Sequence, residues 1–138
     1  MVRGIRREFL LSFLGILFVL FFSCKNNTDA GPPPLPEKNL SFSQHIRPIF
    51  LDYCANAPGC HRAQDAAGGL DLESPFPTLI GNSGKVVIPG DPEHSLLFQV
   101  LISNVGDIPR MPLNRPPLGE SYIRAIETWI AEGAKINN

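Results

Sequence analysis

Two cysteines and a histidine lie close together in the stretch Cys-Ala-Asn-Ala-Pro-Gly-Cys-His, residues 54–61. The whole chain of 138 residues contains only 3 Cys and 3 His, so this stretch holds two of the three cysteines and one of the three histidines. Three kinds of chemistry use such residues: a disulfide, a zinc site, or covalent attachment of haem through thioethers, with the histidine as an iron ligand.

The order of the residues favours the third chemistry. A structural zinc site takes four ligands, usually from two spaced pairs, and the sequence has no second Cys/His pair. A disulfide between Cys54 and Cys60 stays open, and closing so short a loop would stabilise the fold by about 2 kcal/mol. Haem attachment needs a histidine directly after the second cysteine, and His61 has that position. A disulfide does not need it.

Haem also predicts a second axial ligand elsewhere in the chain, commonly a methionine thioether. Met111 is the only methionine besides the initiator. A lone methionine is more often a core residue. However, Pro109 and Pro112 flank this one, which keeps the loop out of a helix and limits its freedom. Such a loop suits a ligand that must be held against a metal.

Three helices can be predicted from apolar periodicity, over residues 43–53, 92–101 and 120–132. The first tolerates Pro48 near its first turn. Asp91-Pro92-Glu93 supplies an N-cap, a proline and an acid for the second, and Gly133 ends the third. No run alternates well enough to predict a sheet. Three short helices with long loops enclose little, so we expect an apolar group in the middle of this mainly α domain.

Several short motifs, read in order, resemble the small bacterial cytochrome c domain of the planctomycete type. They are Phe42, His45-Ile46-Arg47-Pro48-Ile49-Phe50, Cys60-His61, Gly69-Leu70-Asp71-Leu72, Pro89-Gly90-Asp91-Pro92, Ser95-Leu96-Leu97, Arg110-Met111-Pro112, Pro117-Leu118, Trp129-Ile130 and Gly133-Ala134. The resemblance implies a class I cytochrome c-like fold over residues 41–138 with one covalent haem c. It also implies that Cys54 and Cys60 form the thioethers, that His61 is the proximal iron ligand and that Met111 is the distal one.

The spacing of the cysteines departs from the family pattern. C-x-x-C-H, or a slightly longer motif, is usual, whereas five residues separate Cys54 from Cys60. A longer loop is entropically cheap, at about 0.6 kcal/mol per doubling of length, and Pro58-Gly59 can form a turn before Cys60. Two thioethers, a single one through Cys60, or a haem-free protein with a disulfide all remain open.

The N-terminus predicts export. Arg3, Arg6 and Arg7 precede an apolar run over residues 9–22, which fits a secretory signal and is short for a membrane span. The run ends at Ser23-Cys24, which resembles a bacterial lipobox with Cys24 as the lipidated residue, although ordinary cleavage or an uncleaved anchor would place the domain on the same side. Residues 1–23 are thus the predicted signal peptide and residues 24–40 a proline-rich tether. We expect a lipoprotein on the periplasmic side of a membrane.

The charge of the mature chain disfavours a nucleic-acid partner. Loss of residues 1–23 removes Arg3, Arg6, Arg7 and Glu8, which lowers Lys+Arg from 12 to 9 and Asp+Glu from 13 to 12, a formal charge of −3.

Other residues carry weaker expectations. Arg47 and Arg110 could pair with haem propionates, and Trp129 is expected in the core. His45 is expected to form hydrogen bonds near the surface, with iron ligation as its alternative, and His94 to be solvated.

Two functions follow from the sequence. In the first, the domain is a monohaem electron carrier, held near redox protein partners by its lipid, and is a monomer by default. In the second, it is a haem-free, disulfide-closed lipoprotein module that binds a partner. An enzyme is not expected, because His61 and Met111 would fill both axial positions, and only the loss of Met111 ligation would allow peroxidase-like activity.

Overall fold

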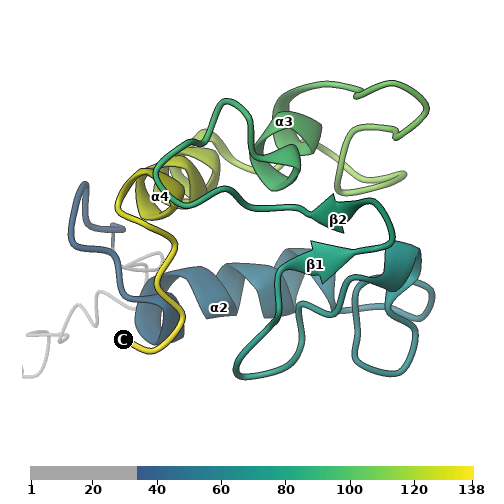
Figure 1. Ribbon diagram of the computed structural model, residues 1–138, viewed down its shortest axis with the longest axis horizontal. Helices are drawn as coiled ribbons and strands as arrows, with labels where there is room; N and C mark the ends of the chain where they lie inside the picture. The colour runs from purple at the N-terminus through teal and green to yellow at the C-terminus, as the bar shows by residue number, and fades with distance from the viewer. Residues whose placement is uncertain (1–33) are drawn as a thin grey trace, which may run out of the picture. The chain divides into compact units, whose positions relative to one another are not determined.

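The computed structural model describes residues 34–138. One helix, over residues 42–54, lies on one side of the domain, and α3 (Leu96–Ile102) and α4 (Glu120–Ala131) lie on the other (Figure 1). The turn η3 (Ala67–Gly69) and two strands, β1 (Ile80–Gly81) and β2 (Gly84–Lys85), complete the elements. The mainly helical prediction with three helices is confirmed. The predicted signal peptide and Cys24 lie outside the described residues.

The first helix consists of three consecutive segments, η1 (Phe42–Ile46), α2 (Arg47–Ile49) and η2 (Phe50–Cys54). The Ser41 hydroxyl caps its start by accepting the N–H of Gln44. Pro48 removes one donor from the middle, and the segments on both sides use wide π-helical hydrogen bonds. The prediction of a helix here is confirmed, although the π-helical segments were not foreseen.

The second helix starts later than predicted. The sequence predicted a start at Pro92, but α3 begins at Leu96. The Ser95 hydroxyl accepts the N–H of Ile88 over 2.8 Å and donates to the Asp91 carbonyl over 2.8 Å. Residues 91–95 therefore form a separate turn against the Ile88 segment, because these bonds hold Ser95, which is fully buried, outside the helix.

The third helix ends as its sequence predicted. Gly133 adopts a φ of +99°, which glycine reaches without strain. Its N–H donates to the carbonyl of Ile130, and the N–H of Ala134 donates to that of Trp129, each over 2.9 Å. This pair of bonds is a Schellman motif, which satisfies carbonyls at the helix end.

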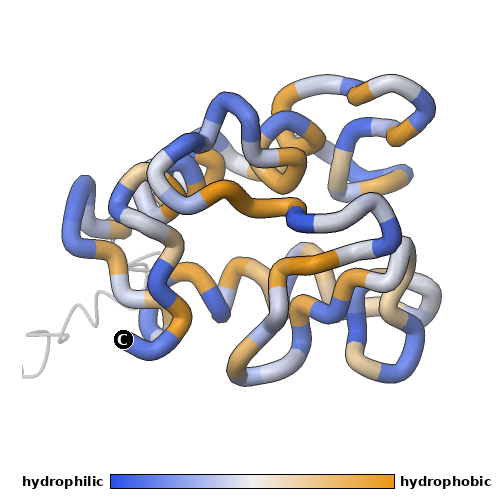
Figure 2. The backbone as a smooth tube through the Cα atoms, viewed as in Figure 1, coloured by the Kyte–Doolittle hydropathy of each residue, from blue (hydrophilic) through white to orange (hydrophobic). Residues whose placement is uncertain are grey.

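An aromatic cluster holds the first and last helices together. The ring centroid of Trp129 lies 5.7 Å from that of Phe42 and 6.0 Å from that of Phe50. The Trp129 Nε1–H donates to the carbonyl of Lys135 over 2.9 Å, so the buried indole has its partner. Figure 2 shows apolar residues along the first helix and along the segment after β2, which both border the core. The predicted core position of Trp129 is confirmed.

Strands β1 and β2 form a small antiparallel hairpin that the sequence did not predict. Gly81 pairs with Gly84, and Asn82 and Ser83 form the turn between them. The strands are two residues long and rich in glycine, so they show no alternation of apolar and polar residues.

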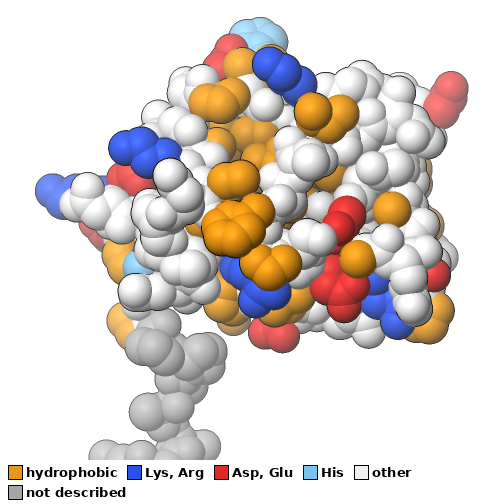
Figure 3. Space-filling view, turned by 60° about the horizontal axis from the view of Figure 1, so that its bottom comes forward, with side chains coloured by type: hydrophobic (Ala, Val, Ile, Leu, Met, Phe, Trp, Pro, Cys, Tyr) orange, Lys and Arg blue, Asp and Glu red, His pale blue; other side chains and the backbone are white. Residues whose placement is uncertain are grey.

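Some large apolar side chains stay exposed, namely Phe76, Ile80, Ile88, Ile102 and Leu113. Figure 3 shows apolar side chains gathered near the middle of one face, with charged side chains around them. Within residues 34–138, no helix has both the length and the apolar character needed to cross a bilayer.

Candidate haem site

A cavity of about 520 Å³ opens into the domain and is lined by both cysteines, His61 and Met111. This volume falls in the range of about 300–1,000 Å³ that small-molecule sites occupy. Most of its walls are apolar, and the lining side chains include Tyr53, Pro58, Leu70, Leu72, Val86, Leu96, Leu97, Val100, Leu101, Ile108 and Leu113. The four residues that the sequence singled out for haem therefore share one cavity.

The five-residue insert between the cysteines folds back on itself. Cys54 is the last residue of η2, and its carbonyl accepts the N–H of His61 over 3.1 Å. The N–H of Cys60 donates to the carbonyl of Ala57 over 3.3 Å. These bonds close the insert into a loop at the cavity edge, so that Cys54 and Cys60 both line the cavity despite their separation. Both are free thiols.

The two thiols border a poorly solvated space. Burial, with a smaller contribution from the neighbouring Cys60, raises the pKa of the Cys54 thiol to about 12. The residue as a whole is only half-buried, since part of it faces the open cavity. A neutral sulfur is therefore strongly favoured at this position, whether as a thiol or as a thioether.

His61 is oriented through its ring nitrogen. Its Nδ1 lies 3.3 Å from the carbonyl oxygen of Leu70, which can only accept a hydrogen bond. Its own carbonyl accepts the N–H of Leu72 over 2.8 Å, so both ends of the residue are bonded to the same segment. Donation from Nδ1 leaves the lone pair on Nε2, the nitrogen that remains available to a metal.

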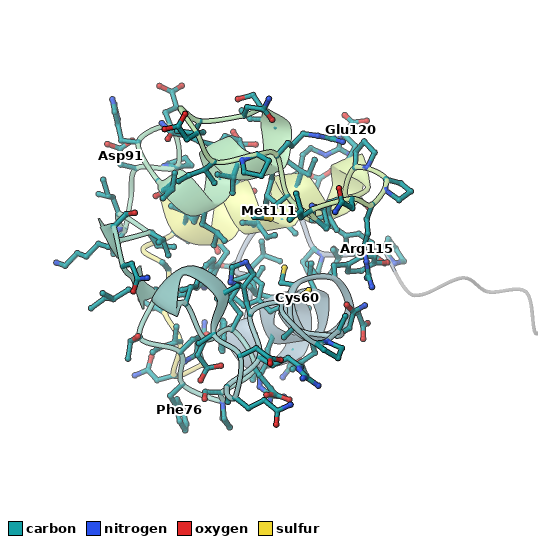
Figure 4. All side chains as sticks on the ribbon, turned by 90° about the vertical axis from the view of Figure 1, so that its right-hand side faces the viewer. Cys60, Phe76, Asp91, Met111, Arg115 and Glu120 are labelled. Atoms are coloured by element: carbon teal, nitrogen blue, oxygen red, sulfur yellow. The ribbon has the colours of Figure 1, made fainter. Side chains whose placement is uncertain are left out.

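Met111 reaches the cavity from the opposite layer. Its N–H donates to the carbonyl of Val100 in α3 over 2.7 Å. Just before it, the N–H of Arg110 donates to Oδ1 of Asn104 over 2.8 Å. Figure 4 shows Met111 and Cys60 on opposite sides of the central region between the layers. An imidazole and a thioether thus approach one cavity from two sides.

The donor set and the walls fit a haem. Two thiols, an imidazole and a thioether are the groups that c-type haem uses, and the apolar walls suit a porphyrin. Among the described residues, no Asp or Glu lines the cavity, so a ligand with carboxylates meets no like charge there. Within the same residues, no group of three or more His, Cys, Asp or Glu side chains gathers that could hold a metal ion by itself.

The structure does not bring the other predicted residues to this cavity. Arg47 donates to the carbonyl of Glu73 over 3.2 Å, and neither Arg47 nor Arg110 is among the residues that line the cavity, so their pairing with propionates stays a prediction. His45 accepts the N–H of Ser41 at Nδ1 over 2.9 Å, as a hydrogen-bonding histidine. His94 is exposed and contacts Asp91, in agreement with its predicted solvation.

Four polar cavity residues were missed by sequence reasoning: Asn82, Ser83, Asn114 and Arg115. They lie in the β1–β2 turn and in the loop after Met111, where no motif marks them. Only the proximity of Arg115 to Met111 in the sequence could have pointed to one of them.

Comparison with known proteins finds one family model that matches part of the chain. Residues 58–112 match the family model described as Planctomycete cytochrome C. The matched segment includes Cys60, His61 and Met111, and it begins after Cys54. No curated protein and no solved structure matches the chain. The match supports a planctomycete-type cytochrome c domain in the part of the chain that contains residues 58–112.

Proposed function

We propose that this chain is a monohaem c-type cytochrome that carries electrons on the extracytoplasmic side of a membrane, tethered by lipid at Cys24. The observation that carries the proposal is that Cys54, Cys60, His61 and Met111 all line the same cavity. Family membership supports the same coarse function, an electron-transfer protein rather than an enzyme.

Each residue has a role in this proposal. Cys54 and Cys60 would form the thioethers, and the hydrogen bonds that fold the insert back support this role because both cysteines line the cavity. His61 would ligate iron through Nε2, with the Leu70 carbonyl fixing its ring. Met111 would supply a soft, neutral ligand from the other side, which favours the ferrous state. Haem iron that cycles between ferric and ferrous states supplies the electron-transfer chemistry.

The apolar walls have two effects in the proposed carrier. They exclude water, which lowers the local dielectric and disfavours the extra positive charge of the ferric state. They would also hold His61 and Met111 in place beside the haem. If both residues bind the iron, no coordination site would be left for a substrate.

A redox titration of the haem-loaded, full-length chain tests this function. The absorption spectrum is expected to follow a reversible one-electron curve. His61→Ala should abolish the low-spin spectrum, while His94→Ala, a change at an exposed histidine away from the cavity, should leave both spectrum and curve unaltered. A haem-loaded chain without a reversible couple would contradict the carrier function.

Membrane tethering is tested separately. The wild-type chain, expressed with its own N-terminus, is expected in the membrane fraction and to incorporate labelled fatty acid. Cys24→Ser should lose the label. Equal labelling of both chains would show that Cys24 is not the lipidated residue.

A further inference from the structure

This inference rests on the proposed function and concerns the residues that fix the orientation of the His61 ring. Within residues 34–138, the ring has one hydrogen bond, from Nδ1 to the carbonyl oxygen of Leu70 over 3.3 Å. Bonds between a nitrogen and an oxygen are usually about 2.7–3.2 Å long. This one is at the long end, so a small movement of the Leu70 carbonyl would break it. Whatever holds Leu70 in place therefore also holds the ring.

A turn built on Asp71 shapes the segment that follows Leu70. Oδ1 of Asp71 accepts the N–H of Glu73 over 2.9 Å and the N–H of Ser74 over 3.1 Å. The hydroxyl of Ser74 donates to the other carboxylate oxygen of Asp71. The backbone of residues 70–74 is thus folded by its own side chains.

This segment is bonded to the residues around His61 at three places. Nδ1 of His61 donates to the Leu70 carbonyl, and the N–H of Leu72 donates to the carbonyl of His61 over 2.8 Å. The third contact comes from Glu73, whose Oε2 accepts the N–H of Ala63 over 2.9 Å. The carboxylate of Glu73 therefore fixes how residues 61–63 lie against residues 70–74.

Arg47 ties the same segment to the first helix. Its Nη2 donates to the carbonyl of Glu73 over 3.2 Å. Within residues 34–138, no other hydrogen bond joins the helix of residues 42–54 to residues 70–74. Loss of the guanidinium would leave this end of the segment without its polar contact to the helix.

A further feature of Arg47 indicates that stability alone does not explain this residue. Its Nε is buried and, in the described part of the chain, has no hydrogen-bond partner. A buried donor without a partner destabilises the fold. An apolar side chain of similar length, such as methionine, would avoid that cost. The bond from Nη2 to Glu73 is what arginine supplies here and methionine does not.

We propose that Arg47 and Glu73 are positioning residues for His61. Arg47 holds the backbone of Glu73, and the Glu73 carboxylate holds that of Ala63. Together they keep the Leu70 carbonyl where it accepts the Nδ1–H of His61. That bond selects the tautomer with its lone pair on Nε2, the form that can ligate iron through this nitrogen.

Nuclear magnetic resonance of the haem-loaded, full-length chain in its ferrous state tests the proposal. The measured quantity is the rate at which the Nδ1–H of His61 exchanges with solvent. Arg47→Met and Glu73→Ala should each speed this exchange about two- to tenfold, the factor that corresponds to one hydrogen bond. Arg47→Lys keeps a donor and Glu73→Gln keeps an acceptor, so both should retain the slow exchange of the wild type.

Two controls separate positioning from other effects. Arg62→Met removes the same charge from the residue next to His61, but Arg62 pairs with Asp65 and not with residues 70–74. It should leave the exchange unaltered. The Nε1–H of Trp129, which donates to the Lys135 carbonyl in the core, reports general opening of the fold. Its exchange should stay unchanged in Arg47→Met and Glu73→Ala.

The proposal is overturned if Arg47→Met and Glu73→Ala exchange as slowly as the wild type, or if Arg62→Met speeds the exchange as much as they do. Equal acceleration at Trp129 would also overturn it, since the two residues would then act on stability alone. Haem content is measured first, and a haem-free wild type refutes the proposed function itself. The inference is then decided on the haem-free chain, by whether the same two variants lose the Nδ1–H tautomer of the neutral His61 ring.

Discussion

The backbone N–H of Met111 donates a hydrogen bond of 2.7 Å to the carbonyl of Val100, which joins the methionine loop to α3. Val100 itself is buried and lines the cavity. The position of the loop is thus fixed by a bond that does not involve the methionine side chain. A substitution at Met111 should remove the thioether and leave the loop in place.

Met111→Ala is therefore expected to lower the midpoint potential of the haem-loaded chain, because a ligand that favours ferrous iron is lost. The fall should be on the order of 0.1 V, within the span of about 0.8 V that axial ligands cover. The open position should also bind imidazole and show hydrogen peroxide-dependent oxidation of a dye. Ile102→Ala, at an exposed α3 residue outside the cavity, should do none of this. An unchanged potential in Met111→Ala would show that Met111 is not the ligand.

Trp129→Ala is expected to lower the free energy of unfolding by about 3–5 kcal/mol. The indole is 1% exposed, packs on Phe42 and Phe50, and donates to the Lys135 carbonyl. Phe76→Ala removes another aromatic ring, but one that is 70% exposed, and should change stability by no more than about 0.5 kcal/mol. Chemical denaturation followed by circular dichroism measures both. Similar losses in the two variants would contradict the described core.

Gly69→Ala tests the close packing of Gly69 against Asn82, a residue of the β1–β2 turn. The added Cβ would overlap the Asn82 side chain, and alanine would also have to adopt a φ of +72°. Gly106→Ala meets the second difficulty alone, since its φ is +57° and nothing lies within 4 Å of the new Cβ. The control should cost about 1–2 kcal/mol, and Gly69→Ala should cost more. Equal costs would mean that the glycine does not hold the turn.

The pair of Asp91 and His94 predicts a pH dependence at an exposed site. The hydrogen bond from Nδ1 of His94 to Asp91 raises the pKa of His94, and the same contact lowers the pKa of Asp91. The contribution of His94 to stability is present below its unfolded pKa and lost as pH rises through the folded value. That of Asp91 is present above its unfolded pKa and lost as pH falls through the folded value.

The ion pair of protonated His94 and ionised Asp91 is thus present at mildly acidic pH, above the pKa of Asp91 and below that of His94. A proton NMR titration of the His94 ring should give a midpoint above the ordinary value of about 6.5. Asp91→Asn should lower that midpoint toward the ordinary value. A midpoint that does not respond to this substitution would contradict the contact.

Three residues that line the cavity, Cys60, His61 and Met111, could be singled out from the sequence because local order marks them. His61 follows Cys60 directly, and Met111 is the only internal methionine, so each is singled out without any tertiary information. The terminal helices could also be predicted, since their apolar periodicity and the glycine after α4 are local signals. Whether Cys54 could meet Cys60 at one cavity was not predictable, because that depends on how the insert closes.

Other features depend on contacts between distant segments. The helix α3 begins at Leu96 instead of Pro92, because the bonds of the Ser95 hydroxyl to the Ile88 N–H and the Asp91 carbonyl hold Ser95 as an extended residue before the helix. The β1–β2 hairpin follows from close approach to Gly68 and Gly69, which no alternation of residues encodes. Arg47 was assigned to the haem by its charge, but it bonds to the Glu73 carbonyl. Charge in a sequence does not tell which loop a guanidinium reaches.

The central claim is that this chain carries haem covalently at Cys54 and Cys60. The most direct measurement is the pyridine haemochrome spectrum and intact mass of the denatured full-length chain, from a host that matures c-type haem. One haem per chain with the band of a two-thioether haem is predicted, and Cys54→Ser and Cys60→Ser should each move the band to the single-thioether position. Haem-free protein with a disulfide between Cys54 and Cys60, from a host that matures a control cytochrome normally, would contradict the account.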